Sequence, residues 1–105
     1  QRVTLEGAFK KPGIYPLTGK TTLLQAIAMA EGLDKLADPR GVVVFRNIDG
    51  KRMGAAFDLV AVRRGEVVDP QVYGDDVIVV ETSGSRTAVR EFIDKLGVFA
   101  MFLAL

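Results

Sequence analysis

The sequence predicts an α+β domain in which a β-sheet wraps one short helix. Residues 23–30 contain no charged side chain, and a helix without a polar face is buried on more than one side. Strand-forming segments precede and follow this helix, and the dipeptide Asp49-Gly50 is among the strongest short-range hairpin signals. We therefore expect a first hairpin, then the helix, and then the strands that complete the sheet.

The first hairpin is predicted from a proline–glycine turn. In Lys11-Pro12-Gly13, proline fixes the first corner of a type II turn and glycine takes the positive φ of the second. Pro16 lacks an N–H donor, which predicts that the second strand is short or lies at a sheet edge. The apolar strand residues on the two sides of the turn are Val3, Leu5 and Phe9, then Ile14, Tyr15 and Leu17.

Both ends of the helix carry capping signals. Thr22 and Gln25 have the spacing of a capping box, in which each side chain accepts a hydrogen bond from the backbone N–H of the other residue. Gly32 stands where a left-handed C-terminal cap belongs, and Leu33 supplies the hydrophobic contact that usually follows it. These signals place the helix between Thr22 and Gly32.

A second hairpin follows a polar connection over residues 34–40. The strand 42–48 leads into Asp49-Gly50, and both residues tolerate the positive φ of a type I′ turn. A two-residue turn sets the pairing register and gives these opposed pairs on the core side: Val42 with Phe57, Val44 with Ala55, and Arg46 with Met53. The other side of this ribbon is only moderately polar, which indicates a second contact surface formed by Val43, Phe45 and Ala56.

Shorter elements are predicted beyond the second hairpin. Asp58 caps a helical turn over residues 59–64, and Gly65 ends it. After a connection with a turn at residues 73–76, the apolar run 77–80 has the composition of a central strand.

The C-terminal segment differs from the preceding domain. We expect one domain over residues 1–82 and an amphipathic to apolar helix over residues 83–105, because helical periodicity begins there. The last ten residues are apolar all round but too few for a lone transmembrane helix, which needs roughly 20 residues. Its own domain, a neighbouring subunit or lipid must therefore cover this segment. The expected subunit or lipid contacts are Phe92, Leu96, Phe99, Phe102 and Leu103.

Composition excludes several functional classes. The 105 residues carry a net charge of +1 with no basic stripe, which argues against a nucleic-acid partner. Cysteine and histidine are both absent, so disulfides, ordinary zinc sites and imidazole-dependent triads are excluded. We assign no catalytic residue, no metal ligand and no cofactor to the sequence.

The remaining polar motifs have structural explanations beside the functional ones. Gly19-Lys20-Thr21 lacks the glycine that a phosphate loop places five residues earlier, where Ile14 stands. Paired aspartates at 34 and 38, and at 75 and 76, fit turns and caps better than acid–base or metal chemistry.

Two residues are kept as a candidate glycan contact, Tyr15 for stacking and Lys20 for charge. Lys20 belongs to a small basic spot with Lys10 and Lys11, which fits a solvated loop better than a site for an anionic ligand or a lipid headgroup. Tyr15 and the other tyrosine, Tyr73, could stack on sugar rings but fit half-buried packing beside a turn better.

These motifs together resemble an SLBB (soluble ligand-binding β-grasp) domain of bacterial outer-membrane polysaccharide export proteins. The resemblance runs from Val3 to Val80: a strand containing Glu6-Gly7-Ala8-Phe9, then Lys-Pro-Gly-Ile-Tyr, then the helix, and finally Gly-Asp-Asp-Val-Ile-Val-Val. Glu31 stands in for the first glycine of the pair that closes the family's helix, and Phe9 for the last valine of its strand.

The resemblance implies a β-grasp (ubiquitin-like) fold, with a mixed sheet around one central helix. It also implies a homo-oligomer ring in the periplasm or outer membrane of a Gram-negative bacterium, through which capsule or exopolysaccharide passes. An inner-membrane polysaccharide co-polymerase would be the partner, and a C-terminal helix would contact the outer membrane. The family's N-terminal export domain is missing, so we expect the chain to be a C-terminal portion.

The sequence therefore predicts a non-enzymatic structural part of a polysaccharide export channel. Two alternatives stay open. One is a stand-alone module that binds a glycan or a small ligand, and the other is a β-grasp adaptor within a larger enzyme.

Overall fold

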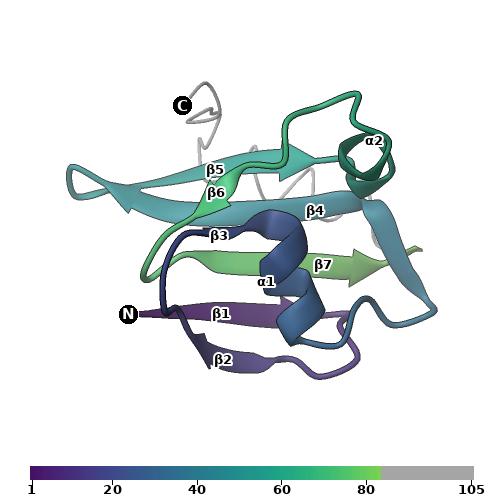
Figure 1. The fold of residues 1–105 in the computed structure, drawn as a ribbon, viewed down its shortest axis with the longest axis horizontal. Helices are drawn as coiled ribbons and strands as arrows, with labels where there is room; N and C mark the ends of the chain where they lie inside the picture. The colour runs from purple at the N-terminus through teal and green to yellow at the C-terminus, as the bar shows by residue number, and fades with distance from the viewer. Residues whose placement is uncertain (84–105) are drawn as a thin grey trace.

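The computed structural model describes residues 1–83, which form two sheets and two short helices (Figure 1). The larger sheet has five strands in the order β2-β1-β7-β4-β5, and β3 pairs with β6 in a separate two-stranded sheet. The strands of the larger sheet are β1 (Arg2–Gly7), β2 (Gly13–Pro16), β4 (Ala37–Ile48), β5 (Lys51–Phe57) and β7 (Val77–Thr82). The other elements are β3 (Thr21–Thr22), α1 (Leu23–Met29), α2 (Leu59–Arg63) and β6 (Gln71–Val72).

The α+β class is confirmed. β1 and β7 pair in parallel while the other neighbours pair antiparallel, so the sheet is mixed. Helix α1 lies across one face of this sheet, over β7 and β1 (Figure 1). The arrangement is compatible with a β-grasp-like fold.

The first hairpin forms, but its predicted tight turn is wrong. Leu5 pairs with Gly13, so Gly13 begins β2 and is not a turn corner. The positive φ of this connection is at Gly7, whose φ is 100°. A Cβ at Gly7 would lie 2.1 Å from the carbonyl oxygen of Val80 on β7. Glycine is required there because the backbones of the two strands approach closely.

The longer connection lies against the C-terminal end of α1. The N–H of Lys11 donates to the carbonyl of Ala30, and the N–H of Lys10 donates to that of Gly32, both at 3.0 Å. Phe9, which we predicted in the first strand, lies beyond its end and bridges to Leu33 with its side chain buried. Pro16 ends β2, and β2 is an edge strand as predicted.

The capping box of α1 is confirmed, and its C-terminal cap differs from the prediction by one residue. Thr22 and Gln25 exchange both hydrogen bonds. The first left-handed residue after the helix is Glu31, with a φ of 62°, and Gly32 follows with a φ of 89°. The N–H of Glu31 donates to Ala28 and that of Gly32 to Ile27, which is the bonding pattern of a Schellman motif.

A second cap for α1 comes from a distant part of the chain. The N–H of Leu23 donates to the carbonyl of Pro70 at 2.8 Å, and that of Leu24 donates to Oδ1 of Asp69 at 3.1 Å. The pairing of β3 with β6 brings these residues to the helix. We predicted residues 66–76 to be a connection and did not predict the strands β3 and β6.

The second hairpin has the predicted register. Val42 pairs with Phe57, Val44 with Ala55 and Arg46 with Met53. Asp49 and Gly50 have φ values of 52° and 80°, as a type I′ turn requires. β4 begins earlier than predicted because Ala37 already pairs with Thr82 of β7, before a register irregularity that ends at Val42. Part of the expected polar connection is therefore strand.

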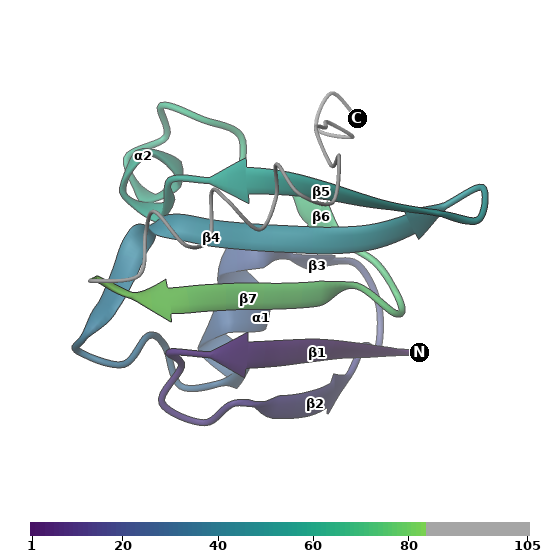
Figure 2. The same ribbon diagram turned by 180° about the vertical axis from the view of Figure 1, so that it is seen from behind.

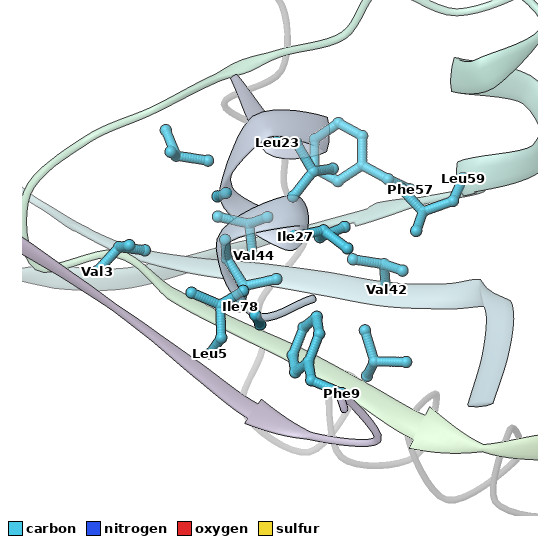
Figure 3. Packing of buried hydrophobic residues seen from close by; sticks show 14 of the residues in the cluster. Val3, Leu5, Phe9, Leu23, Ile27, Val42, Val44, Phe57, Leu59 and Ile78 are labelled. Atoms are coloured by element: carbon cyan, nitrogen blue, oxygen red, sulfur yellow. The ribbon is translucent and has the colours of Figure 1, made fainter. Parts of the chain in front are cut away.

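One hydrophobic core fills the space between α1 and the sheet (Figure 3). Leu23, Ala26 and Ile27 of the helix are buried against residues of four of the five strands of the larger sheet. The buried strand residues of this core are Val3, Leu5, Ala37, Val42, Val44, Ala55, Phe57, Val72, Ile78 and Val80. All of them lie between residues 3 and 80, so these residues form a hydrophobic core within the described domain.

Two further predicted elements are present. Asp58 caps α2 by accepting hydrogen bonds from Val60 and Ala61, and Gly65 follows the helix with a φ of 76°. β7 lies at the centre of the sheet, as its apolar composition predicted. The predicted C-terminal helix, including Phe92, Leu96, Phe99, Phe102 and Leu103, falls outside the described residues.

Candidate functional site

The most developed polar cluster joins β4 to the turn before β7. Asp76 is fully buried, and its carboxylate accepts from Nε of Arg46 at 2.9 Å and from Nη2 at 2.8 Å. The same carboxylate accepts from the N–H of Tyr73 at 2.9 Å, and the Arg46 guanidinium lies 4.5 Å from the centroid of the Tyr73 ring. Nη2 of Arg46 also donates to the carbonyl of Gln71.

The hydrogen bonds of this cluster give it a structural role, because its side chains bond one another and the backbone. A bidentate arginine–carboxylate pair is strong and directional, and here it fixes the Tyr73 turn to β4. Arg46 lies on the core side of β4 and Asp76 bonds the backbone of its turn, both as predicted. We did not predict the contact between the two residues, because β4 and the turn before β7 become neighbours only in the folded sheet.

The other paired aspartates bind backbone groups. Oδ1 of Asp34 accepts from the N–H of Leu36 at 2.9 Å, and Oδ1 of Asp38 accepts from that of Arg40 at 3.0 Å. Within residues 1–83 there is no group of three or more acidic, histidine or cysteine side chains that could hold a metal ion. The aspartates of the described domain therefore act mainly as turn and cap residues.

The Gly-Lys-Thr segment leads into α1 without forming a phosphate cradle. Oγ1 of Thr21 donates to the carbonyl of Gly19 at 3.2 Å. The N–H groups of the first helical turn are already bonded by Pro70, Asp69 and Thr22. A negatively charged side chain thus occupies the position that a bound phosphate would take.

The candidate glycan residues lie in and after the edge strand β2. Tyr15 is half-buried against the core, and its hydroxyl donates to the carbonyl of Lys11. Lys20 is exposed in the connection between β2 and β3. No hydrogen bond joins Tyr15 to Lys20 in the part of the chain that the structure describes.

The predicted basic spot is partly neutralised. Nζ of Lys11 lies 2.9 Å from a carboxylate oxygen of Glu31, and both side chains are exposed. The hydrogen bond to Glu31 and the attraction of opposite charges raise the pKa of Lys11 above its ordinary value of 10.5. The pair connects the β1–β2 loop to the end of α1.

The sheet face opposite α1 carries an apolar group that we name the rear patch: Val43 and Phe45 of β4 with Val77 and Val79 of β7. Val43 pairs with Val79 and Phe45 with Val77, so all four side chains point to the same side of the sheet. The Arg52 guanidinium lies 4.6 Å from the centroid of the Phe45 ring. Val43 and Phe45, which we predicted in a second contact surface, thus share this face with residues of β7.

The comparisons identify the family. The family model of the SLBB domain matches residues 2–56 of the sequence, slightly more than half of the 105 residues. The chain therefore belongs to the SLBB domain family, whose domains are ligand-binding modules. No curated protein matches the sequence.

One further property concerns membranes. Among residues 1–83, neither helix has the length and apolar character needed to cross a bilayer.

Proposed function

We propose that this SLBB domain is a β-grasp component of a polysaccharide export channel, and that it acts by homo-oligomeric assembly. The observation that carries the proposal is the fully apolar sequence 96–105 that follows the domain. The hydrophobic effect drives such a segment out of water. Contact between subunits in a ring, or contact with lipid, removes residues 96–105 from water.

The polar side chains of the domain support a structural part rather than an enzyme. Asp76 is committed to Arg46, and Asp69 is committed to the start of α1. Asp58 caps α2 with its carboxylate. A general base or nucleophile needs a group that is available to a substrate, and these carboxylates are engaged by the fold.

The location and partners follow from the proposed channel. The chain would act in the periplasm or at the outer membrane, where capsule or exopolysaccharide passes through the ring. An inner-membrane polysaccharide co-polymerase would deliver the polymer. The apolar residues Phe99, Phe102 and Leu103 would make the subunit or lipid contacts.

Solution mass measured by light scattering tests this proposal. We would compare residues 1–105 with residues 1–96, each with and without mild detergent, since the core lies within residues 3–80 and only the apolar residues 97–105 are removed. We expect the longer chain to assemble or to bind micelles, and the shorter chain to remain a folded monomer. A monomeric longer chain that ignores detergent would refute the proposed assembly.

A variant of residues 1–105 separates the effect of side-chain contacts from the effect of chain length. Replacing Phe99, Phe102 and Leu103 with serine should reduce the mass to that of a monomer. The matched control replaces Asp94 and Lys95, which are polar, with serine and should leave the assembly unchanged.

A stand-alone ligand-binding module is the second candidate, favoured by membership of a ligand-binding family. Tyr15 would stack on a sugar ring, and Lys20 would bind an anionic group. Titration with an acidic oligosaccharide should then shift the backbone NMR signals of residues near Tyr15 and Lys20 in a saturable way. Tyr73 provides the control, because its ring already contacts Arg46.

A further inference from the structure

The rear patch is an apolar surface on the face of the sheet that lacks a described layer. Figure 2 views this face, with α1 and the β3–β6 pair behind the sheet. Val43 and Phe45 are only 1% and 3% exposed, although no second layer of helix or strand within residues 1–83 lies over this face (Figure 2). The Arg52 side chain of β5 contacts the Phe45 ring. Four adjacent apolar side chains favour a covering partner, because sheets are stable when each apolar face is buried.

The chain leaves the described domain at the end of a strand that contributes to this patch. β7 supplies two of the four patch residues and ends at Thr82, in the middle of the sheet. The N–H of Ser83 donates to the carbonyl of Leu36 at 2.9 Å, which holds the end of the strand in place. Residues 84–105 continue from there, so a short connection suffices to reach the patch.

The sequence after this exit point matches the patch in pattern and size. Between residues 86 and 96, apolar residues recur with helical spacing at Ala88, Val89, Phe92, Ile93 and Leu96. Eleven helical residues span about 16 Å at 1.5 Å per residue. Neighbouring strands are about 4.8 Å apart, so a helix of this length crosses both strands of the patch.

We propose that residues 86–96 pack on the rear patch of their own chain and form the second layer of the domain. A second copy fits this patch less well, because a stable interface buries about 800 Å² on each partner, more than four side chains provide. The covalent connection also gives the segment an effective concentration in the millimolar range. An intramolecular contact therefore outcompetes the same contact made between chains.

This inference does not rest on the proposed export function. It takes Phe92 and Leu96 into an intramolecular contact and leaves residues 97–105 for assembly or lipid. Residues 97–105 would then begin at a fixed position relative to the sheet.

Paramagnetic relaxation in the chain of residues 1–105 tests the proposal. The sequence contains no cysteine, so Glu91→Cys gives a single site for a nitroxide spin label. We expect severalfold loss of NMR intensity at the amides of Val43, Phe45, Val77 and Val79. The amides of α1, on the opposite face, should keep their intensity.

Two further measurements decide the origin of any signal loss. In a mixture of spin-labelled chain without ¹⁵N and unlabelled ¹⁵N chain, intensity loss at the rear patch would show a contact between copies and overturn the proposal. Uniform or absent loss in the first experiment would also overturn it. The double change Phe92→Ser and Ile93→Ser should abolish the loss, whereas Arg90→Ser on the charged side should preserve it.

Discussion

Replacing Asp76 with asparagine should destabilise the domain strongly. The carboxylate is completely buried and accepts three hydrogen bonds, two from Arg46 and one from the N–H of Tyr73. Asparagine has nearly the same shape but no charge, so it leaves the Arg46 guanidinium, whose side chain is only 12% exposed, without its counter-ion. Removing one partner of a buried pair costs about 3–5 kcal/mol. That is a large part of the 5–15 kcal/mol by which domains are typically stable.

Urea unfolding followed by circular dichroism measures this loss. The matched control is Asp75→Asn, the same chemical change at the preceding residue. Asp75 is exposed and has a φ of 70°, a conformation that asparagine tolerates, so its free energy of unfolding should change by less than about 0.5 kcal/mol.

A double-mutant cycle protects the test against a variant that fails to fold. Arg46→Met removes the buried charge, so Arg46→Met with Asp76→Asn should be less destabilised than the sum of the two single variants. The reasoning would be refuted if Asp76→Asn cost no more than Asp75→Asn. Strict additivity in the cycle would equally refute a direct coupling between the two side chains.

Three further predictions concern single positions. Gly7→Ala should lower the free energy of unfolding in urea by about 3 kcal/mol, because the added Cβ would meet the β7 backbone and the φ of Gly7 is 100°. Gly19→Ala should be nearly neutral, because no atom lies within 4 Å of the added Cβ. Glu31→Gly should stabilise the domain by about 0.5–1 kcal/mol by relieving a left-handed glutamate, and Gly32→Ala should destabilise it; equal thermal midpoints for the two variants would contradict this. Glu31→Gln should lower the pKa of Lys11 toward 10.5 in an NMR titration. Because the pKa of Lys11 is raised in the folded state, the contribution of this pair to stability is complete below the pKa of the unfolded state and is lost as pH rises through the pKa of the folded state. An unchanged Lys11 titration in Glu31→Gln would exclude the pair.

Local signals in the sequence predicted local structure well. The capping box at Thr22 and Gln25, the Asp49-Gly50 turn and the register that it imposes depend on residues a few positions apart, and all are present. The resemblance to an SLBB domain is also confirmed, over residues 2–56. Each of these features can be recognised without knowing where distant segments lie.

Features that depend on distant contacts were missed. The Lys11-Pro12-Gly13 sequence suits a tight turn, but the backbone of Lys11 is bonded to the end of α1 and Gly13 already pairs in β2. The positive φ is at Gly7, where the backbone passes close to β7. The Asp76–Arg46 pair and the Asp69 cap of α1 likewise join segments far apart in the sequence. In the candidate site, the apolar pattern of β4 indicated the rear patch, but its continuation onto β7 required the sheet order.

The central position of β7 determines when the chain can fold. β1 and β4 have no contact through strand pairing until β7 lies between them, because the order is β2-β1-β7-β4-β5. A growing chain that ends at residue 56, the limit of the SLBB match, holds two hairpins with unpaired edges and no strand to join them. Pairing of residues 4 and 77 closes a long loop, and such non-local contacts slow folding. Synthesis must therefore pass β7 before the sheet assembles, and until then the exposed edges of both hairpins are open to wrong partners.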